Sequence, residues 1–353
     1  MKIHEKFIRR CIQIAKKGFP EAMPNPSVGA VIVYKGKIIG EGYTSTYGGA
    51  HAEVNAINSV NQKELLREST LYVSLEPCSH HGKTPPCSDL IIREKIKKVV
   101  IGAVDPYAEV AGRGIQKLQN AGHKVITGVL EKECIDINKR FFTFHLKKRP
   151  YIILKWAQTD NRYLSPDQKD INNSNPQPFW ITNSYSKQLV HKWRAEEQAI
   201  LVGTNTVIND NPKLNTRQWE GKNPVRIVLD ATLRIPRTYA IYDDSIPTIV
   251  ITDVSNTSIP TYNNIIFEKI DFSTAVGIQI CNILYKHSIQ SLIVEGGKKT
   301  LNTFIKESLW DEARIFTSKK TVINNGLKAP EISGKLERID SINGDQLKII
   351  TNS

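Results

Sequence analysis

Short apolar runs alternate with segments of helical periodicity through the first 150 residues of the chain. Strands are predicted where apolar residues cluster between turn residues, at 28–33, 37–42, 70–75, 98–104 and 124–128. Helices are predicted at 5–17, from about residue 50, from residue 87 and at 114–120. This alternation indicates an α/β domain whose ligands bind at the carboxyl ends of the strands.

The same alternation starts again in the second half of the chain. Its apolar runs predict strands at 151–156, 199–203, 224–230, 247–252, 291–295, 312–317 and 347–350. Helices are predicted at 184–196 and from about 300 to 306. A polar stretch at 170–176 has no periodicity and is expected to be a loop. These elements predict a second, mixed sheet.

The length of 353 residues exceeds the size at which one hydrophobic core stops growing, so we expect two domains. A basic run ends at Pro150, which disfavours helix at Arg149, and an apolar strand begins directly after it. We therefore place the domains at 1–147 and 150–353. The basic run between them, residues 147–149, is interpreted as a solvated linker rather than a binding patch.

The formal net charge of +13 indicates a ligand that carries phosphate, or a nucleic acid. Because Lys and Arg are scattered along the chain, a small phosphorylated substrate is favoured over nucleic acid. No apolar run is long enough to cross a membrane, and residues 1–7 lack the features of a signal peptide. We therefore expect a cytoplasmic protein with no membrane partner, and we expect a homo-oligomer.

Five cysteines without a secretory signal argue against a disulfide framework. Cys11, Cys134 and Cys281 lie in helix-like apolar patterns and are expected to be buried thiols without chemistry. Cys78 and Cys87 differ, because each follows a proline in a polar loop. Cys87 is also expected to begin a helix, which lowers the pKa of a thiol and favours metal binding.

The candidate chemistry of the first half rests on His51, Glu53, Cys78 and Cys87. One imidazole and two thiols suit a tetrahedral Zn²⁺ whose fourth position is open to water. Glu53 lies two residues after the histidine and is placed to move protons beside that water. A closed structural zinc site would need a fourth ligand, for which His80 or His81 is available, but it leaves Glu53 unexplained. We favour polar pocket residues as the role of both histidines.

The order H-x-E, then P-C, then a second cysteine is the signature of zinc-dependent nucleobase deaminases. In such a site an activated water attacks a ring carbon that carries an exocyclic amine, and Glu53 would shuttle the protons. Eight residues separate Cys78 from Cys87, however, whereas the usual spacing in these deaminases is two.

That long loop and several motifs resemble the bifunctional deaminase/reductase family of riboflavin biosynthesis, RibD. In the first half the resemblance is carried by residues 51–56, 75–87, 105–106 and 110–114, and in the second by 155–159, 180–182, 194–195, 202–207, 210–217, 226–230 and 294–297. It implies a cytidine-deaminase-like three-layer α/β/α domain followed by a dihydrofolate-reductase-like α/β domain. The implied reactions are hydrolytic deamination of a phosphoribosylaminopyrimidine and NADPH-dependent reduction of its ribosyl group to the ribityl form.

In the deaminase domain, the resemblance implies that Asn25, Lys83 and Asp105 contact the substrate. Lys83 would bind its phosphate as a compact cation, although a solvent-exposed loop lysine is the alternative. Asn25 can equally cap the turn between its two prolines. Thr44 stands where the family commonly has a histidine. The substrate contact that this histidine would make is therefore not assigned to a residue of this chain.

In the reductase domain, the resemblance places Arg194, Leu214, Arg217 and Glu295 at substrate positions. Arg194 and Arg217 could pair with a phosphate, or each could form a surface salt bridge. Lys155 and Glu295 are the expected catalytic residues, polarising the sugar during reduction. Positions expected to bind the cofactor are Gln158, Trp180, Thr206, Asp210, Ala231, Gly296 and Gly297.

Three of these cofactor positions have simpler alternatives. Trp180 could be a core aromatic and Asp210 a turn residue before Pro212. The glycine pair at 296–297 lies between a strand and a helix, where a dinucleotide phosphate can bind, but such a turn favours glycine in any case. The pair is not a G-x-G-x-x-G fingerprint, so a Rossmann fold is not predicted.

One departure concerns the reductase. The family usually has Asp-Gly a few residues after the lysine, whereas this chain has Asn161 and Arg162. Arginine adopts a positive φ less readily than glycine, so either the loop differs or the pocket is altered.

Two other functions compete with the bifunctional enzyme. A deaminase that edits nucleic acid would require aromatic residues interleaved with basic ones near the pocket, and the loop at 76–86 has no aromatic residue. A zinc-stabilised interaction protein would have no use for Glu53. The zinc motif predicts Zn²⁺ as one cofactor, and the resemblance to the deaminase/reductase family implies NADPH as the other.

Overall fold

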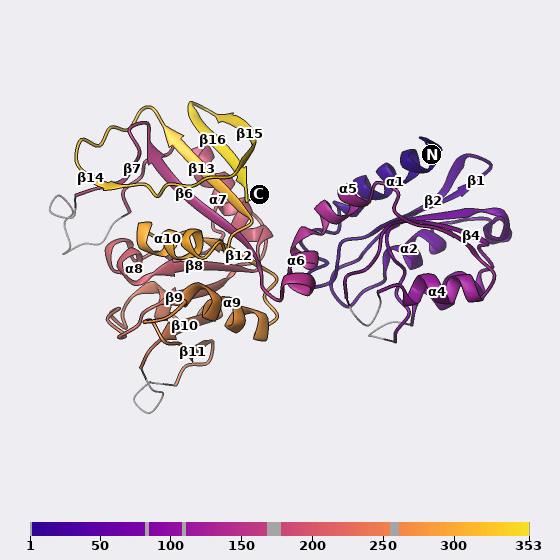
Figure 1. Cartoon of the computed structure of the whole chain (residues 1–353), viewed down its shortest axis with the longest axis horizontal. Coiled ribbons are helices and arrows are strands. Elements are labelled where there is room, and N and C mark those ends of the chain that lie inside the picture. The colour runs from indigo at the N-terminus through magenta and orange to yellow at the C-terminus, as the bar shows by residue number, and fades with distance from the viewer. Residues whose placement is uncertain (1, 82–84, 108–110, 168–177, 255–260, 353) are drawn as a thin grey trace. The chain divides into compact units, whose positions relative to one another are not determined.

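The structure is a computed structural model that describes residues 2–81, 85–107, 111–167, 178–254 and 261–352. The chain divides into two compact units, residues 1–148 and residues 149–353 (Figure 1). Each has its own hydrophobic core. Within the described ranges, no helix has both the length and the apolar character needed to cross a membrane.

The first unit contains one five-stranded sheet in the order β2-β1-β3-β4-β5. The strands are β1 (Gly29–Tyr34), β2 (Lys37–Tyr43), β3 (Thr70–Leu75), β4 (Lys98–Ala103) and β5 (Lys124–Ile126). The helices are α1 (Lys2–Ala15), α2 (Ala52–Asn58), α3 (Cys87–Arg93), α4 (Arg113–Asn120), α5 (Glu131–Ile137) and α6 (Lys139–Lys147). Strand β1 is antiparallel to β2 and β3, while β3, β4 and β5 are parallel.

Helices cover both faces of this sheet, with α1 and α5 on one side and α2 to α4 on the other (Figure 1). Glycine permits the closest of these contacts. A Cβ at Gly29 would lie 2.0 Å from the carbonyl oxygen of Cys11 in α1, and one at Gly42 would lie 2.3 Å from the amide nitrogen of Ala56 in α2. Helix α2 is therefore held directly against β2, which fixes the position of its first turn.

The second unit contains a nine-stranded sheet in the order β11-β10-β9-β8-β12-β6-β13-β16-β15. Its strands are β6 (Tyr151–Thr159), β8 (Ala199–Gly203), β9 (Val225–Leu229), β10 (Thr248–Thr252), β11 (Ile265–Lys269), β12 (Ser291–Val294), β13 (Glu312–Ser318), β15 (Lys335–Ile342) and β16 (Asp345–Thr351). A separate pair is formed by β7 (Tyr163–Pro166) and β14 (Gly326–Lys328). The helices are α7 (Ser184–Glu196), α8 (Thr204–Asp210), α9 (Val276–Lys286) and α10 (Lys298–Lys306).

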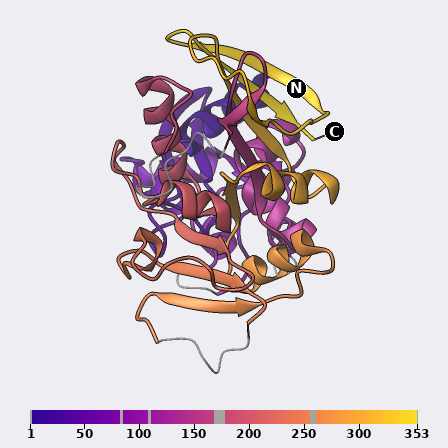
Figure 2. The same ribbon diagram turned by 90° about the vertical axis from the view of Figure 1, so that its left-hand side faces the viewer.

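The large sheet is parallel from β11 to β13 and ends in an antiparallel pair, β16 and β15. Figure 2 shows both ends, with β10 and β11 in orange and the β15–β16 hairpin in yellow. Alternate residues of a strand face opposite sides of its sheet. On β6, Leu154 packs in the core that includes α9 and α10, whereas Ile153 packs in the core that includes α7. Lys155 therefore faces the α7 side.

Most predicted strands agree with the structure to within one or two residues, and the expectation of two α/β domains with a mixed second sheet is confirmed. Helix α1 begins and ends earlier than predicted, at Lys2 and Ala15. The interpretation of the basic run as a solvated linker is wrong for Arg149. That side chain is buried and forms two hydrogen bonds with Asp311, at 2.6 and 2.9 Å, because the carboxylate compensates its charge. The loop predicted at 170–176 lies outside the described residues.

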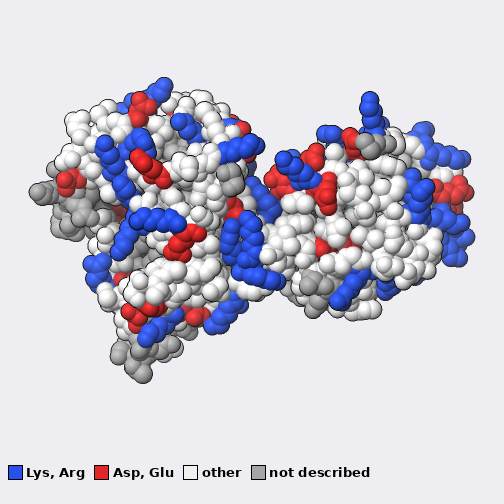
Figure 3. Space-filling model, viewed as in Figure 1, with Lys and Arg blue, Asp and Glu red and all other residues white. Residues whose placement is uncertain are grey.

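Positive charge is distributed over the molecule. On the face drawn in Figure 3, Lys and Arg side chains occur on both units, with Asp and Glu among them. The three cysteines expected to be buried, Cys11, Cys134 and Cys281, are buried free thiols.

Candidate functional sites

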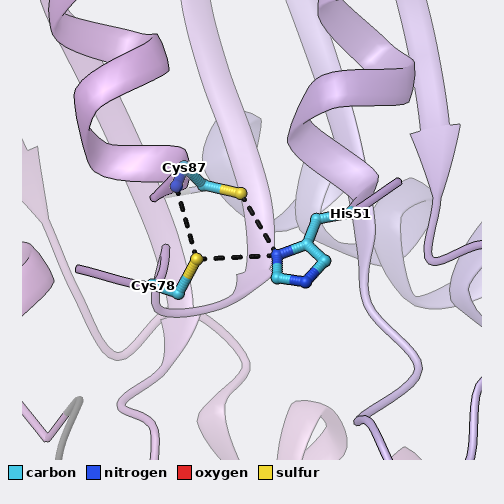
Figure 4. A group of neighbouring side chains, drawn as sticks. All are labelled: His51, Cys78 and Cys87. Atoms are coloured by element: carbon cyan, nitrogen blue, oxygen red, sulfur yellow. Dashed lines mark hydrogen bonds between the residues drawn. The ribbon is translucent and has the colours of Figure 1, made fainter. Parts of the chain in front are cut away.

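Three segments of the first unit bring His51, Cys78 and Cys87 together (Figure 4). His51 is the extended residue directly before α2, rather than part of its first turn as predicted. Cys78 lies in the loop after β3, and Cys87 is the first residue of α3. The Nδ1 atom of His51 lies 3.5 Å from the Sγ of Cys78 and 3.3 Å from that of Cys87. The backbone N–H of Cys87 donates to the Cys78 sulfur at 3.3 Å.

These residues match what zinc requires. In a tetrahedral site, Zn–S and Zn–N bonds of ordinary length place nitrogen and sulfur ligands about 3.6 Å apart. The potential ligand atoms of the three residues all lie within 4.8 Å of one another. A hydrogen bond from Cys87, and then one from His51, lowers the pKa of Cys78 to about 4, so this sulfur is available as a thiolate ligand. No fourth His, Cys, Asp or Glu joins them in the described part of the chain, which favours an open site.

Glu53 lies in the first turn of α2, beside this group, and is 4% exposed. Burial, and then the negative charge of Cys78, raises the pKa of Glu53 to about 7. A carboxyl group with a pKa near neutrality can both accept and release a proton, as general acid–base catalysis requires.

The site contains a second buried carboxylate, Glu76, to which the sequence analysis gave no role. Its oxygens accept hydrogen bonds from four backbone N–H groups, those of Asp105, Gly112, Gly114 and Ile115, at 2.9 to 3.3 Å. Glu76 thereby fixes the loop after β4 and the start of α4 next to the Cys78 loop. The signal in the sequence was its position immediately before Pro77 and Cys78.

Asp105, expected at a substrate position, is held through its backbone N–H, which donates to Glu76. Its carboxylate accepts a hydrogen bond from the N–H of Tyr107 at 2.8 Å. Burial, and then the charge of Glu76, raises the pKa of Asp105 to about 7.

The other expected residues of this site are placed as follows. Asn25 is half-buried in the loop between α1 and β1, where its N–H donates to the carbonyl of Ala22. Thr44 is buried and its hydroxyl accepts the N–H of Val28 at 2.9 Å, so it stabilises the loop after β2. Lys83 lies outside the described residues. His80 is half-buried, and its ring packs edge-on against Tyr107.

A charged group lies in the second unit, where the C-terminal half of α7 faces β6 and β12. The guanidinium of Arg194 donates two hydrogen bonds to Glu295, at 2.9 and 3.2 Å, and Lys155 lies 3.5 Å from the same carboxylate. Burial raises the pKa of Glu295, but Arg194 and then Lys155 outweigh it and lower the pKa to about 2. Burial lowers the pKa of Lys155. This buried pair rules out the surface salt bridge for Arg194.

Arg217 and Leu214 lie on the segment after α8, opposite this group. Arg194 donates to the carbonyl of Asn215 at 3.3 Å, and Arg217 donates to the side-chain oxygen of Asn215 at 2.9 Å. Leu214 is buried with a φ of 55°. The segment therefore positions Arg217 close to Arg194, where repulsion between the two contributes, after burial, to a lowered pKa of Arg217.

Several expected cofactor residues lie on segments that follow the carboxyl ends of β8 and β12. Thr206 in α8 accepts the N–H of Gly297 at 3.1 Å, which joins the start of α8 to the glycine pair before α10. Asp210 ends α8, and burial raises its pKa to about 6. Trp180 is 50% exposed, which rules out the core-aromatic alternative.

Gln158 and Ala231 complete this set. Gln158, near the end of β6, accepts the indole N–H of Trp156 at 2.9 Å. The carbonyl of Ala231, just after β9, accepts hydrogen bonds from Thr252 and Asp253. The structure gives both residues local hydrogen bonds and leaves their role toward the cofactor as a prediction.

The Asn161–Arg162 departure is accommodated by the turn after β6. Arg162 has a φ of 67°, so the turn adopts the left-handed conformation with arginine in the place of glycine. Asn161 accepts the hydroxyl of Thr159 at 2.6 Å and donates to the carbonyl of Ile323 at 2.8 Å. Both the oxygen and the nitrogen of the Asn161 side-chain amide therefore have hydrogen-bond partners within the protein.

Comparison with known proteins assigns each of the two units to a protein family. Residues 1–103 match the family described as the cytidine and deoxycytidylate deaminase zinc-binding region, and residues 150–322 match the RibD C-terminal domain. The riboflavin biosynthesis protein RibD of Aquifex aeolicus is 40% identical, covering 94% of this chain and 90% of the relative. That of Actinobacillus pleuropneumoniae is 37% identical, covering 95% and 88%. The chain belongs to the RibD family.

Solved structures agree with this RibD assignment. A diaminohydroxyphosphoribosylaminopyrimidine deaminase/5-amino-6-(5-phosphoribosylamino)uracil reductase from Thermotoga maritima is 36% identical with a TM-score of 0.86, covering 100% of this chain and 99% of that one. RibD of Acinetobacter baumannii is 29% identical with a TM-score of 0.85, again covering 100% and 99%. The predicted fold class is confirmed: a cytidine-deaminase-like domain followed by a dihydrofolate-reductase-like one.

Family membership also confirms the predicted function class. The chain is a bifunctional enzyme of riboflavin biosynthesis, with a zinc-dependent deaminase and an NADPH-dependent reductase. The expected cofactors, Zn²⁺ and NADPH, are those of these two domains.

Proposed function

We propose that the first unit deaminates diaminohydroxyphosphoribosylaminopyrimidine and that the second reduces 5-amino-6-(5-phosphoribosylamino)uracil. The names of both reactions are those of the Thermotoga maritima relative. The observation that carries the first step is Glu53, buried beside three zinc-binding side chains and with a pKa near 7.

In the deaminase, His51, Cys78 and Cys87 would hold the zinc ion. The chemistry that zinc supplies when bound is activation of a water molecule for attack at neutral pH. Glu53 accepts the proton of the attacking water, passes it to a ring nitrogen and protonates the departing ammonia. Asp105, held by Glu76, contacts the substrate, as do Asn25 and Lys83.

In the reductase, NADPH supplies the hydride, and the protein supplies orientation and charge. Lys155 and Glu295 polarise the sugar at the carbon that is reduced, while Arg194, Arg217 and Leu214 bind the rest of the substrate. Thr206, Asp210, Trp180, Gln158, Ala231 and the glycine pair at 296–297 bind the cofactor. Support comes from the Lys155–Glu295–Arg194 cluster, a buried group of paired charges where β12 ends beside the middle of β6.

The experiment supplies the diamino substrate to the full chain with NADPH and follows ammonia release and NADPH oxidation together. Glu53→Gln should bind zinc and fold but release ammonia at least about a hundredfold more slowly, since a positioned acid–base group contributes 10²–10⁴-fold. The exposed Glu64→Gln serves as the matched control and should behave as wild type. Unchanged ammonia release by Glu53→Gln would refute the proton-transfer role.

The reductase is tested with the deaminated substrate supplied directly. Glu295→Gln should slow NADPH oxidation, while ammonia release from the diamino substrate stays normal. Wild-type NADPH oxidation by this variant would contradict the catalytic role of Glu295.

We also propose that the enzyme is a cytoplasmic homo-oligomer. Free thiols at all five cysteines are compatible with a reducing compartment. The edge strand β15 leaves Leu336 and Ile339 half exposed, which a second copy could cover. Light scattering on the purified chain tests the oligomer, and a monomer at micromolar concentration would contradict it.

A further inference from the structure

One face of α7 carries three nitrogen-bearing side chains on successive turns, Lys187, His191 and Arg194. Residues spaced four and three positions apart lie on the same side of a helix. Arg194 is in the reductase group described above through Glu295. His191 is 3% exposed, and the charges of Arg194 and Arg217 act on it. Lys187 occupies the next turn toward the start of the helix.

Around this face of α7, positively charged side chains outnumber the negatively charged ones that pair with them. Lys155 and Arg194 share Glu295, whereas no carboxylate in the described part of the chain forms an ion pair with Lys187 or Arg217. The pKa of Lys187 is lowered by burial and then by the positive charge of Arg217. Two cations that repel each other without a compensating carboxylate are arranged to receive an anion.

His191 gives a second, independent indication of a ligand. Its Nδ1 atom is buried and has no hydrogen-bond partner among the described residues. Buried polar atoms of native proteins are nearly always paired. Burial and the two arginines lower the pKa of His191 to about 4, so the ring is uncharged at neutral pH. Such a ring binds a phosphate oxygen when its one hydrogen is on Nδ1, because phosphate oxygens accept hydrogen bonds.

Trp180 fixes the direction of the Lys187 side chain. The ammonium of Lys187 lies 3.6 Å from the centre of the Trp180 ring, a cation–π contact. Lys192, on the same helix, instead pairs with Glu196 at 3.8 Å and lies over Trp219. Lys187 is thus held against Trp180, whereas Lys192 is held by Glu196 and Trp219.

We propose that Lys187 is a further phosphate-binding residue of the reductase, acting with Arg217 on the phosphate monoester of the substrate. The inference rests on the substrate role proposed above for Arg194 and Arg217. A phosphate monoester could also come from NADPH, since Trp180 lies at an expected cofactor position. The substrate is the source, because the positive charge that acts on Lys187 is that of Arg217, which lies at an expected substrate position.

The test measures steady-state reduction of the deaminated substrate by the full chain and by Lys187→Gln, Lys187→Arg and Lys192→Gln. Loss of one charge-assisted contact should raise the substrate KM of Lys187→Gln about tenfold or more, with kcat changed less than about twofold. Inhibition by inorganic phosphate should weaken by a similar factor. Lys187→Arg should restore most of the affinity, Lys192→Gln should match wild type, and the KM for NADPH should not change.

An unchanged substrate KM in Lys187→Gln would overturn the inference, as would an equal rise in Lys192→Gln. A rise confined to the KM for NADPH would assign Lys187 to the cofactor and overturn it too. Arg217→Gln separates this inference from the proposed site. If Arg217→Gln raises the substrate KM and Lys187→Gln does not, only the inference about Lys187 fails. If neither does, the proposed phosphate site fails with it.

Discussion

At the scale of single residues, two carboxylates of the first unit illustrate how surroundings decide a role. Glu53 and Glu76 are both buried, but Glu76 accepts four N–H groups whereas burial brings the pKa of Glu53 to about 7. Hydrogen bonds to a carboxylate stabilise its charged form, and desolvation favours the neutral form. Glu76 is therefore suited to hold structure, and Glu53 is suited to exchange protons.

Replacing Glu76 should separate these roles. Glu76→Gln puts an amide donor opposite backbone donors, so we expect it to lower the stability of the first unit by about 2–4 kcal/mol. Deaminase activity should fall because Asp105 loses its support, while reduction of the deaminated substrate continues. Thermal unfolding and the two activity assays measure this. Glu41→Gln, which removes only a surface pair with Arg10, should cost less than about 1 kcal/mol. Equal losses of stability in Glu76→Gln and Glu41→Gln would contradict the structural role of Glu76.

Asp210 gives a prediction about pH. Its pKa is raised from 3.8 to about 6 by burial, so its contribution to stability is fully present below the unfolded pKa and is lost as pH rises through 6. Asp210→Asn should therefore raise the free energy of unfolding by about 1–2 kcal/mol at pH 7.5 and by almost nothing near pH 4. Urea unfolding at the two pH values measures the difference, and the exposed Asp160→Asn is the control. A gain independent of pH would contradict the burial argument.

Arg162 occupies a conformation that costs a non-glycine residue about 1 kcal/mol. Because glycine also gains freedom in the unfolded chain, Arg162→Gly should stabilise the second unit by only about 0.5–1 kcal/mol. NADPH oxidation should be retained, since Asn161 holds the turn through Thr159 and Ile323. A variant less stable than wild type would show that the arginine side chain itself supports the turn.

At the scale of elements, the contact between β2 and α2 determines where the deaminase residues lie. A methyl group at Gly42 would meet the backbone of Ala52 and Ala56, neither of which can move without displacing the helix. Gly42→Ala should therefore destabilise the first unit by about 1–3 kcal/mol and reduce zinc content, because His51 directly precedes α2. Metal analysis and thermal unfolding measure this. The matched control for zinc content is Gly36→Asn, in a turn with nothing within 4 Å. Because Gly36 has a φ of 77°, this variant should lose some stability but keep its zinc. Full zinc content in Gly42→Ala would contradict the argument.

Elements with a regular apolar pattern were predictable, and those that depend on distant contacts were not. Strands β3 and β8 and helix α7 have the predicted limits, because their apolar residues are continuous or periodic. The predictions missed α6 and the edge strands β11 and β15. These elements leave apolar residues such as Leu146, Ile266 and Ile339 exposed, so no regular contrast between buried apolar and exposed polar positions marks them in the sequence. Arg149 was assigned to solvent because its partner, Asp311, is 162 positions away in the sequence.

The candidate sites show the same difference between residues marked by a local motif and residues whose partners are distant in the sequence. The zinc-binding residues and Glu53 were predictable from local motifs. Glu76 was not given a role because its partners lie 29 to 39 residues further on. The stripe of Lys187 and His191 has the spacing of a helix face, but a sequence does not show which side of a helix meets a pocket.

At the scale of the whole molecule, two separate cores and two sites predict that the activities can be removed independently. Treatment with a zinc chelator should abolish ammonia release while NADPH oxidation continues on substrate that is already deaminated. Restoring zinc should recover ammonia release, which provides the control. Loss of both activities upon chelation would show that the reductase depends on the metal-bound first unit.

The three zinc-binding residues come from three segments that are separated in the unfolded chain, 27 residues apart between His51 and Cys78 and 9 between Cys78 and Cys87. A site of this kind exists only after folding, so metal affinity and folding are thermodynamically linked. Each tenfold rise in free zinc above the dissociation constant adds about 1.4 kcal/mol to the stability of the folded state. The lifetime of this unit, and with it the supply of flavin precursor, should therefore vary with the zinc supply of the organism that makes it.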